Sequence, residues 1–183
     1  MWRNSKLQWG AAARLFHWIG AAVVAVLIGH GWWMTHQAVR EQRFANYGWH
    51  ADLGYIFLAL LLARLVWKLI NPTPDLPADS KAWERALAHA VHWLLYGLML
   101  VTAGLGWGLA GTFRRPLGDF ALPAIVADRT LHETLEPWHR VASYTLLAVV
   151  VLHVAAALWH HFVQRNDILR RMLGARPADA RQP

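Results

Sequence analysis

The stretch LFHWIGAAVVAVLIGHGWW, residues 15–33, decides the fold class of this chain. It contains no Asp, Glu, Lys or Arg, and its only titratable side chains are His17 and His30. A helix needs about 20 predominantly apolar residues to cross the hydrocarbon core of a bilayer. The stretch therefore predicts a membrane-spanning helix over residues 15–35.

Three further apolar stretches follow along the chain. They predict membrane-spanning helices over residues 50–70, 87–110 and 138–163. The sequence NPTPDLP after the second stretch cannot continue a helix, and Pro137 is placed to begin the fourth helix. The chain is thus expected to cross the membrane four times.

The composition agrees with a membrane protein. Of the 183 residues, 56% are hydrophobic and 16% are charged, whereas an average soluble domain has about 25% charged residues. We expect an all-α bundle of four transmembrane helices in one domain, residues 1–173. Residues 174–183 are polar and predict a disordered cytoplasmic tail.

The basic residues indicate how this bundle is oriented. Four spans place both termini and the middle loop on one side of the membrane, and 12 basic residues fall there: Arg3, Lys6, Arg14, Arg64, Lys68, Lys81, Arg85, Arg165, Arg170, Arg171, Arg176 and Arg181. The opposite side has 6: Arg40, Arg43, Arg114, Arg115, Arg129 and Arg140. By the positive-inside rule, both termini are expected in the cytoplasm. The net charge of +7 then reflects topology in a lipid membrane, and no nucleic acid is expected as a partner.

The chain has no cysteine and 11 histidines. The lack of cysteine excludes disulfides, thiolate-held iron–sulfur clusters and covalent haem attachment through CxxCH. Any metal must therefore be held by His, Met or carboxylate side chains. Because an ionisable residue inside a membrane is costly, each histidine in a span is a candidate functional residue.

The fourth stretch carries the most informative histidine pair. His139 and His153 are 14 residues apart, which in a helix is about 21 Å along the axis and only about 40° of rotation. One helix face therefore offers an imidazole near each membrane surface. At matching depth, His50 is the natural partner of His139, and His17 is the natural partner of His153. Two imidazoles on facing helices can bind one haem iron from opposite sides, so the spacing predicts two haems b.

The other histidines are not expected to bind a haem. His17 and His30 are 13 residues apart and diverge by about 140° around a helix, so only one of them is expected to be a ligand. Gly54 follows His50 by four residues, shares its helix face and leaves room for a flat macrocycle. Hydrogen-bonding or packing roles are expected for His30, His36, His89, His92, His132, His160 and His161.

Over residues 7–173 the chain resembles the bacterial cytochrome b561 family, four-helix dihaem proteins of the inner membrane. The matching pieces are FHW at 16–18, HxxxG at 50–54 with Arg64 and the PTP at 72–74 after it, WH at 138–139, AAALWHHF at 155–162 and NDILRRML at 166–173. The resemblance implies a multi-pass protein of the bacterial inner membrane. It also implies two bis-histidine haems b, with ubiquinone as the electron acceptor.

Carried over residue by residue, the resemblance places the haem ligands on the four histidines that the spacing had paired: His17, His50, His139 and His153. The pairs that it implies are His17 with His153 and His50 with His139. Family members commonly read WHET at the start of the last helix, but this chain reads WHRV there and has HET at 132–134. His132 is therefore a rival to His139, and the proline between them favours His139.

Other residues near these histidines are candidates for contacts with a haem or a quinone. Arg14, Arg64 and Lys68 could hold haem propionates or quinone oxygens near the inner haem, although each also serves as a positive-inside anchor. Asp52, close to His50 in sequence, could orient an imidazole or move a quinone proton.

Three classes of function follow from these residues. The first resembles the superoxide oxidase of the family, in which superoxide donates an electron and ubiquinone accepts it. The outer arginines could steer this small anion, but five acidic residues on the same side nearly balance them, and no catalytic residue is identified.

The second class is a non-catalytic haem subunit that passes electrons between the quinone pool and a periplasmic or membrane redox partner. In that case the outer loop, residues 111–137, docks a protein instead of covering the outer haem. The third class is a histidine-lined transporter without haem, which predicts a colourless protein.

Overall fold

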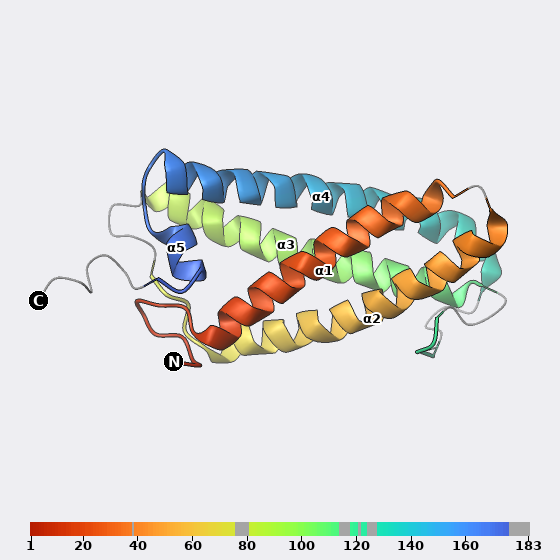
Figure 1. Ribbon diagram of the computed structural model, residues 1–183, viewed down its shortest axis with the longest axis horizontal. Helices are drawn as coiled ribbons and strands as arrows, with labels where there is room; N and C mark the ends of the chain where they lie inside the picture. The colour runs from red at the N-terminus through yellow and green to blue at the C-terminus, as the bar shows by residue number, and fades with distance from the viewer. Residues whose placement is uncertain (38, 76–80, 114–117, 121, 124–127, 176–183) are drawn as a thin grey trace, which may run out of the picture. The chain divides into compact units, whose positions relative to one another are not determined.

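A computed structural model describes residues 1–37, 39–75, 81–113, 118–120, 122–123 and 128–175 (Figure 1). In these residues the regular elements are all helical: α1 (Ala11–Thr35), α2 (Arg40–Ile70), α3 (Ala82–Gly111), the short 3-10 helix η1 (Arg129–Leu131), α4 (His132–Phe162) and α5 (Ile168–Met172). The helices α1 to α4 are each long and apolar enough to cross a membrane, α2 from Glu41 onward. The prediction of an all-α chain is thus confirmed in the described residues, which contain four helices that could each cross a membrane.

Each long helix starts earlier than its apolar stretch. The largest difference is in α2, which begins at Arg40 although its helix is predicted from residue 50. Residues 40–49, REQRFANYGW, are mostly polar or aromatic, so they can continue the helix beyond the apolar core of a membrane. Hydropathy therefore locates the part of each helix that lies in lipid and misses its polar extension.

Local hydrogen bonds set the first residue of α3 and of η1. The backbone N–H of Lys81 donates to the Glu84 carboxylate at 2.9 Å, as in a capping box, and α3 begins at the next residue. Asp128 accepts hydrogen bonds from the backbone N–H and the hydroxyl of Thr130 at 2.9 and 2.8 Å. These bonds lower the pKa of Asp128 below its ordinary value.

The start of α4 differs from the prediction. The helix begins at His132, and Pro137 lies inside it instead of at its first position. A proline inside a helix removes one backbone hydrogen bond and crowds the carbonyl four residues earlier. Because Pro137 lies near the N-terminal end of this 31-residue helix, the helix continues through the proline.

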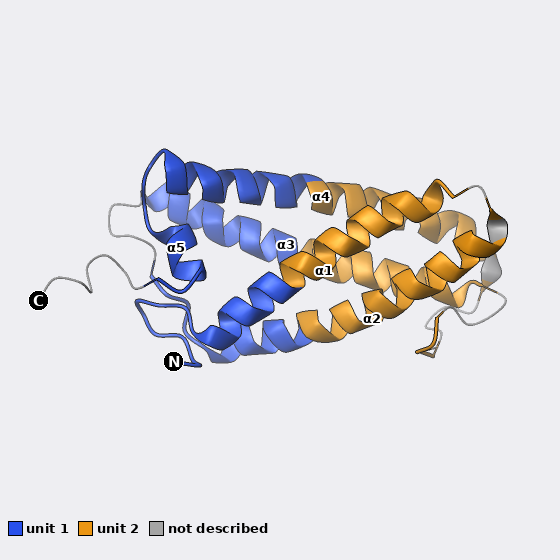
Figure 2. Cartoon of the chain, viewed as in Figure 1, with its two compact units in different colours: residues 1–19, 62–96, 148–183 blue, residues 20–61, 97–147 orange. Residues whose placement is uncertain are grey.

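The chain forms two compact units, each with a segment of every long helix (Figure 2). Unit 1 comprises residues 1–19, 62–96 and 148–183, and unit 2 comprises residues 20–61 and 97–147. Both chain ends belong to unit 1.

In unit 1, one arginine ties together three segments that are distant in sequence. Arg171 of α5 is only 6% exposed and donates to the backbone carbonyls of Leu7 and Asp75 at 2.7 and 2.8 Å. The backbone N–H of Asp75 in turn donates to the carbonyl of Lys6 at 2.8 Å. We call this set of contacts the clasp. It holds α5 and the residues that follow α2 against the N-terminal segment.

In unit 2, a short piece of the outer loop is held on α2. The backbone N–H groups of Asp119 and Phe120 donate to the two carboxylate oxygens of Asp52 at 2.8 and 3.1 Å. Gly118, just before them, has a φ of +75°, and a Cβ there would overlap the Asp52 carboxylate. This turn therefore requires glycine. The predicted tail over residues 174–183 falls outside the described residues from residue 176 onward.

Candidate functional site

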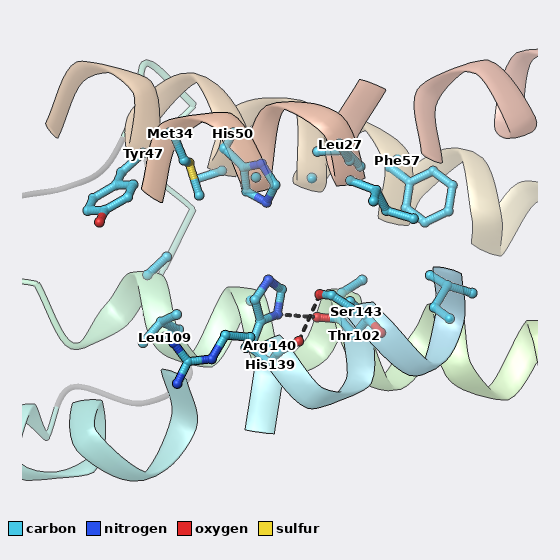
Figure 3. A pocket seen from close by; sticks show the side chains of 18 of the residues that line it. Leu27, Met34, Tyr47, His50, Phe57, Thr102, Leu109, His139, Arg140 and Ser143 are labelled. Carbon is cyan, nitrogen blue, oxygen red and sulfur yellow. Dashed lines mark hydrogen bonds between the residues drawn. The ribbon is translucent and has the colours of Figure 1, made fainter. Parts of the chain in front are cut away.

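Unit 2 contains a cavity of about 540 Å³ between its helix segments (Figure 3). His50 of α2 and His139 of α4 project into it from opposite sides, and Leu27 and Phe57 form part of its apolar lining. Gly54, one of the predicted contacts, also lines it. The volume is within the range of about 300–1,000 Å³ that is usual for cofactor sites.

The two imidazoles of unit 2 have the separation that one shared metal ion requires. The ring centroids of His50 and His139 are 6.4 Å apart, and the ring planes are at 90°. A metal-bound imidazole nitrogen lies about 2 Å from the metal and its ring centroid about 1 Å farther, so two rings on opposite sides of one ion have centroids roughly 6 to 6.5 Å apart. His50 and His139 therefore fit as axial ligands of one haem.

The His139 imidazole is oriented by the backbone of α3. Its Nδ1 donates to the carbonyl of Thr102 at 3.0 Å, which leaves the Nε2 lone pair facing the cavity. A Cβ added at Gly106 would lie 3.0 Å from His139 Cε1. On the other side, a Cβ at Gly31 would lie 3.3 Å from His50 Cε1. Both glycines let a helix backbone approach a candidate ligand closely.

The rival ligand His132 has another partner. Its Nδ1 lies 2.8 Å from the hydroxyl of Thr112, a residue that is 4% exposed. Its ring also packs edge-on against Phe113, with the centroids 5.1 Å apart. The structure therefore brings His139, and not His132, opposite His50.

Unit 1 contains the second predicted pair. The ring centroids of His17 in α1 and His153 in α4 are also 6.4 Å apart, with the planes at 69°. This separation again fits two imidazoles on one iron. His92 of α3, which was given a packing role, lies edge-on to His153 at 5.2 Å, and its Nδ1 donates to the Ala88 carbonyl at 2.6 Å.

Two cations of α2 belong to unit 1, and Arg64 contacts the pair directly. An Arg64 guanidinium nitrogen is 3.2 Å from His17 Nδ1, and its guanidinium carbon is 5.4 Å from the centre of the Tyr96 ring. The Lys68 ammonium is 5.4 Å from the Trp93 ring centre. Within the described ranges, neither cation makes an ion pair with a carboxylate side chain. Arg64 and Lys68 are thus placed to meet an anionic group.

Arg64 lies against Nδ1 of His17. When Arg64 donates to Nδ1, the proton of a neutral imidazole is on Nε2. Nε2 would have to lose that proton to bind a metal, so holding a haem through Nε2 would require Arg64 to release His17. The propionates of a haem offer the guanidinium a new partner.

The remaining predicted contacts lie elsewhere. Arg14 packs against Gly174, just after α5. Both carboxylate oxygens of Asp52 accept hydrogen bonds from the outer loop, and none from His50 is present. Of the outer arginines, Arg140 pairs with Glu136 at 3.4 Å, and Arg43 donates to the Gln37 carbonyl. The side chains of Arg40 and Arg129, and all of Arg114 and Arg115, lie outside the described residues.

Sequence reasoning missed several residues around the imidazole pairs. Gly31, Gly106 and the Thr102 carbonyl contact or orient a candidate ligand, and His30 and His92 lie beside one. The closely spaced glycines at 104, 106 and 108 were the available sequence signal. Backbone carbonyls and neighbouring histidines left no such signal.

The paired imidazoles suit a metal ion that already has most of its ligands from a cofactor. Among the described residues, no three His, Asp or Glu side chains converge as a closed zinc site would require. Each unit instead presents two imidazoles. A haem iron takes four ligands from its porphyrin and needs only two axial ones from the protein.

One protein family and several named proteins are similar to this chain. The family model described as prokaryotic cytochrome b561 matches residues 8–175. The chain is 27% identical over 187 residues to cytochrome b561 homolog 2 of Escherichia coli (strain K12), which covers 96% of both chains. It is 29% identical over 127 residues to the probable superoxide oxidase CybB of Yersinia pestis, covering 68% of this chain and 72% of that protein.

A third relative has a different kind of name. The probable Ni/Fe-hydrogenase B-type cytochrome subunit of Azotobacter chroococcum mcd 1 is 22% identical over 214 residues, covering 90% of this chain and 85% of that protein. The relatives therefore include both the name of an oxidase and the name of a cytochrome subunit.

Proposed function

Because this chain belongs to the prokaryotic cytochrome b561 family, we propose that it is a dihaem membrane oxidoreductase that oxidises superoxide and reduces ubiquinone. It belongs in the bacterial inner membrane with both termini in the cytoplasm. The pair His50 and His139 holds the outer haem, and the pair His17 and His153 holds the inner haem. Bound haem supplies one-electron redox chemistry at each pair.

The observation that carries this proposal is the common geometry of the two pairs. Each pair joins helices that are far apart in sequence, and each has a centroid separation of 6.4 Å. Two unrelated packing histidines would have no reason to adopt that separation, whereas two axial ligands of one iron must do so. Its occurrence in both units supports a dihaem protein.

The overall reaction balances with two substrate anions for each quinone. Two superoxide anions give up one electron each and leave as dioxygen. One ubiquinone takes both electrons together with two protons and becomes ubiquinol. Superoxide is thus oxidised, ubiquinone is reduced, and no further oxidant is needed.

We assign Arg64 and Lys68 the role of binding anionic groups near the inner haem. Arg64 contacts His17, Lys68 packs on the Trp93 ring, and both lack a carboxylate partner among the described side chains. An unpaired cation in a membrane span is costly, and an anion removes that cost. Arg64 can bind a propionate with two parallel hydrogen bonds, while Lys68 acts as a single point charge.

The ligand assignment is tested by counting haem per chain. The full-length protein should contain two haems b, and His139→Leu or His153→Leu should each leave one. His160→Leu is the matched control, because its Nδ1 bonds Gln164 and takes part in neither pair. Two haems retained in either ligand variant, or one lost in the control, would contradict the assignment.

The donor is tested by following the visible spectrum of the oxidised protein during a controlled flux of superoxide. A reduced b-type band should grow, and added ubiquinone should discharge it. Superoxide dismutase added beforehand should prevent the growth. A dihaem protein that superoxide leaves oxidised would not be a superoxide oxidase.

The hydrogenase-type relative favours one alternative, a non-catalytic subunit that passes electrons between the quinone pool and a redox partner. In that case only quinol or the partner protein should reduce the haems. A partner should also purify with the chain in stoichiometric amount. The number of haems per chain is expected to be the same for both functions, so the superoxide experiment is the one that separates them.

A further inference from the structure

The two imidazoles of the outer pair differ in how their second nitrogen is satisfied. Nδ1 of His139 donates to the Thr102 carbonyl at 3.0 Å. Nδ1 of His50 is buried and has no hydrogen-bond partner among the described residues. A histidine that binds a metal almost always donates its other N–H to an acceptor, which fixes the ring and raises its basicity. His50 therefore lacks a partner that its role requires.

His30 is the side chain that can supply this partner. Its ring is 5.9 Å from the His50 ring between centroids, and the two planes are only 15° apart. Nδ1 of His30 is also buried and without a partner.

The surroundings hold His30 in this position. Its ring lies 4.7 Å from the Trp49 ring and 5.5 Å from the Trp33 ring between centroids. The next residue, Gly31, brings the α1 backbone against His50. Two buried nitrogen atoms that need partners thus belong to neighbouring rings on α1 and α2.

We infer that His30 is a positioning residue for the outer haem: its Nδ1 accepts a hydrogen bond from Nδ1–H of His50, directly or through one water molecule. This inference rests on the proposed role of His50 as a haem ligand. A direct bond of about 3 Å between coplanar imidazoles gives centroids about 5.2 Å apart. The observed rings are stacked, with nearly parallel planes and centroids 5.9 Å apart, so a ring rotation or one bridging water must bring the two nitrogen atoms within hydrogen-bonding reach.

The hydrogen bond has a consequence for the redox equilibrium of the outer haem. An acceptor at Nδ1 makes the His50 imidazole a stronger electron donor, which favours the oxidised iron. Loss of the acceptor should therefore raise the midpoint potential of the outer haem. We expect a change of about tenfold in the equilibrium, which is about 59 mV for a one-electron couple.

The test is a potentiometric titration of the purified, haem-loaded protein, with electron paramagnetic resonance of the oxidised haems as a second readout. Two couples are expected in the wild type, and the outer one is the couple that disappears in His139→Leu. His30→Leu should raise the outer potential and shift the outer resonance signal. His30→Gln, which restores an acceptor, should return both toward wild type.

The control is His36→Leu, which removes an exposed histidine that bonds the Trp32 carbonyl. It should change neither couple, and the inner couple should be constant in all variants. An outer potential in His30→Leu equal to that of the wild type would overturn the inference. If His30→Leu binds no outer haem, His30→Gln decides: haem restored at the wild-type potential supports the inference, and haem still absent overturns it. A wild-type protein without two haem couples would contradict the proposed function instead.

Discussion

At the scale of single residues, the imidazole pairs depend on how closely the neighbouring helix backbones approach. His139 is oriented by the Thr102 carbonyl, and its ring edge faces Gly106. His50 has the corresponding contact with Gly31. A helix presents its backbone this closely only where no side chain intervenes, so a Cβ at either position would press against the imidazole.

Gly106→Ala should weaken binding of the outer haem. A Cβ at this position would lie 3.0 Å from His139 Cε1, so the imidazole must move away from its place opposite His50. Changes to residues that orient a metal ligand typically cost 10- to 100-fold in affinity, and we expect about 10-fold here. Haem per chain and haem dissociation rates measure the effect.

Gly104→Ala is the matched control, because a Cβ there would meet no atom within 4 Å. It should retain two haems with unchanged dissociation. Equal haem loss in the two variants would mean that glycine is needed along this part of α3 for helix packing rather than for His139.

At the scale of elements, short polar contacts fasten segments outside the long helices. Arg171 binds the N-terminal segment and the residues after α2, and Asp52 binds residues 119 and 120 of the outer loop. In both cases a charged side chain satisfies backbone groups that have no helical partner. Hydrogen bonds that involve a charged group contribute about 1.5–3 kcal/mol each.

Arg171→Met should destabilise the protein by about 2 to 4 kcal/mol, because the two hydrogen bonds that this buried arginine donates to the Leu7 and Asp75 carbonyls are lost. The midpoint of thermal unfolding in detergent should fall by several degrees. Arg170→Met, at the exposed neighbouring position of α5, should leave the midpoint unchanged. If both variants unfold at the same temperature, the clasp does not stabilise the chain.

Asp52→Ala should release the outer loop and leave the haem content unchanged. The backbone N–H groups of Asp119 and Phe120 lose their acceptors, so their hydrogen exchange should accelerate by more than about tenfold. Asp119→Asn keeps both N–H groups and should not change the exchange. A loss of the outer haem in Asp52→Ala would instead support a role for this carboxylate in orienting His50.

At the scale of the whole molecule, each compact unit carries one complete imidazole pair. Unit 1 holds His17 and His153, and unit 2 holds His50 and His139. Both chain ends belong to unit 1, together with most of the basic residues that predict the cytoplasmic side. Because each pair is built within its own unit, losing one haem is expected to leave the second in place.

The orientation in the membrane is testable with reporter fusions. Because basic residues are retained in the cytoplasm, green fluorescent protein fused to the C-terminus should fluoresce, and alkaline phosphatase there should be inactive. Alkaline phosphatase inserted after Gln37, between α1 and α2, should be active. The reverse pattern would place the termini in the periplasm and exchange the inner and outer haems.

The sequence alone determined the number of spans and the four histidines of the two pairs. Bilayer thickness requires a minimum apolar length, and helical geometry converts the 14-residue spacing of His139 and His153 into depth and rotation. Their role as ligands stays a prediction, but the structure brings them together in the predicted pairs. The predicted helix starts were wrong by up to ten residues, because hydropathy does not detect the polar residues with which a helix continues beyond its apolar stretch.

Only the tertiary structure decided what surrounds each pair. The positions of His30 beside His50, His92 beside His153 and Gly106 against His139 depend on how each helix is rotated and how closely it packs on its neighbours. Asp52 illustrates the same limit, because its nearness to His50 in sequence suggested an imidazole partner and its hydrogen bonds go to a loop about 67 residues later. Spacing along one helix predicts depth and face. Contacts between helices are set by side-chain packing at their interfaces, which no single stretch of sequence contains.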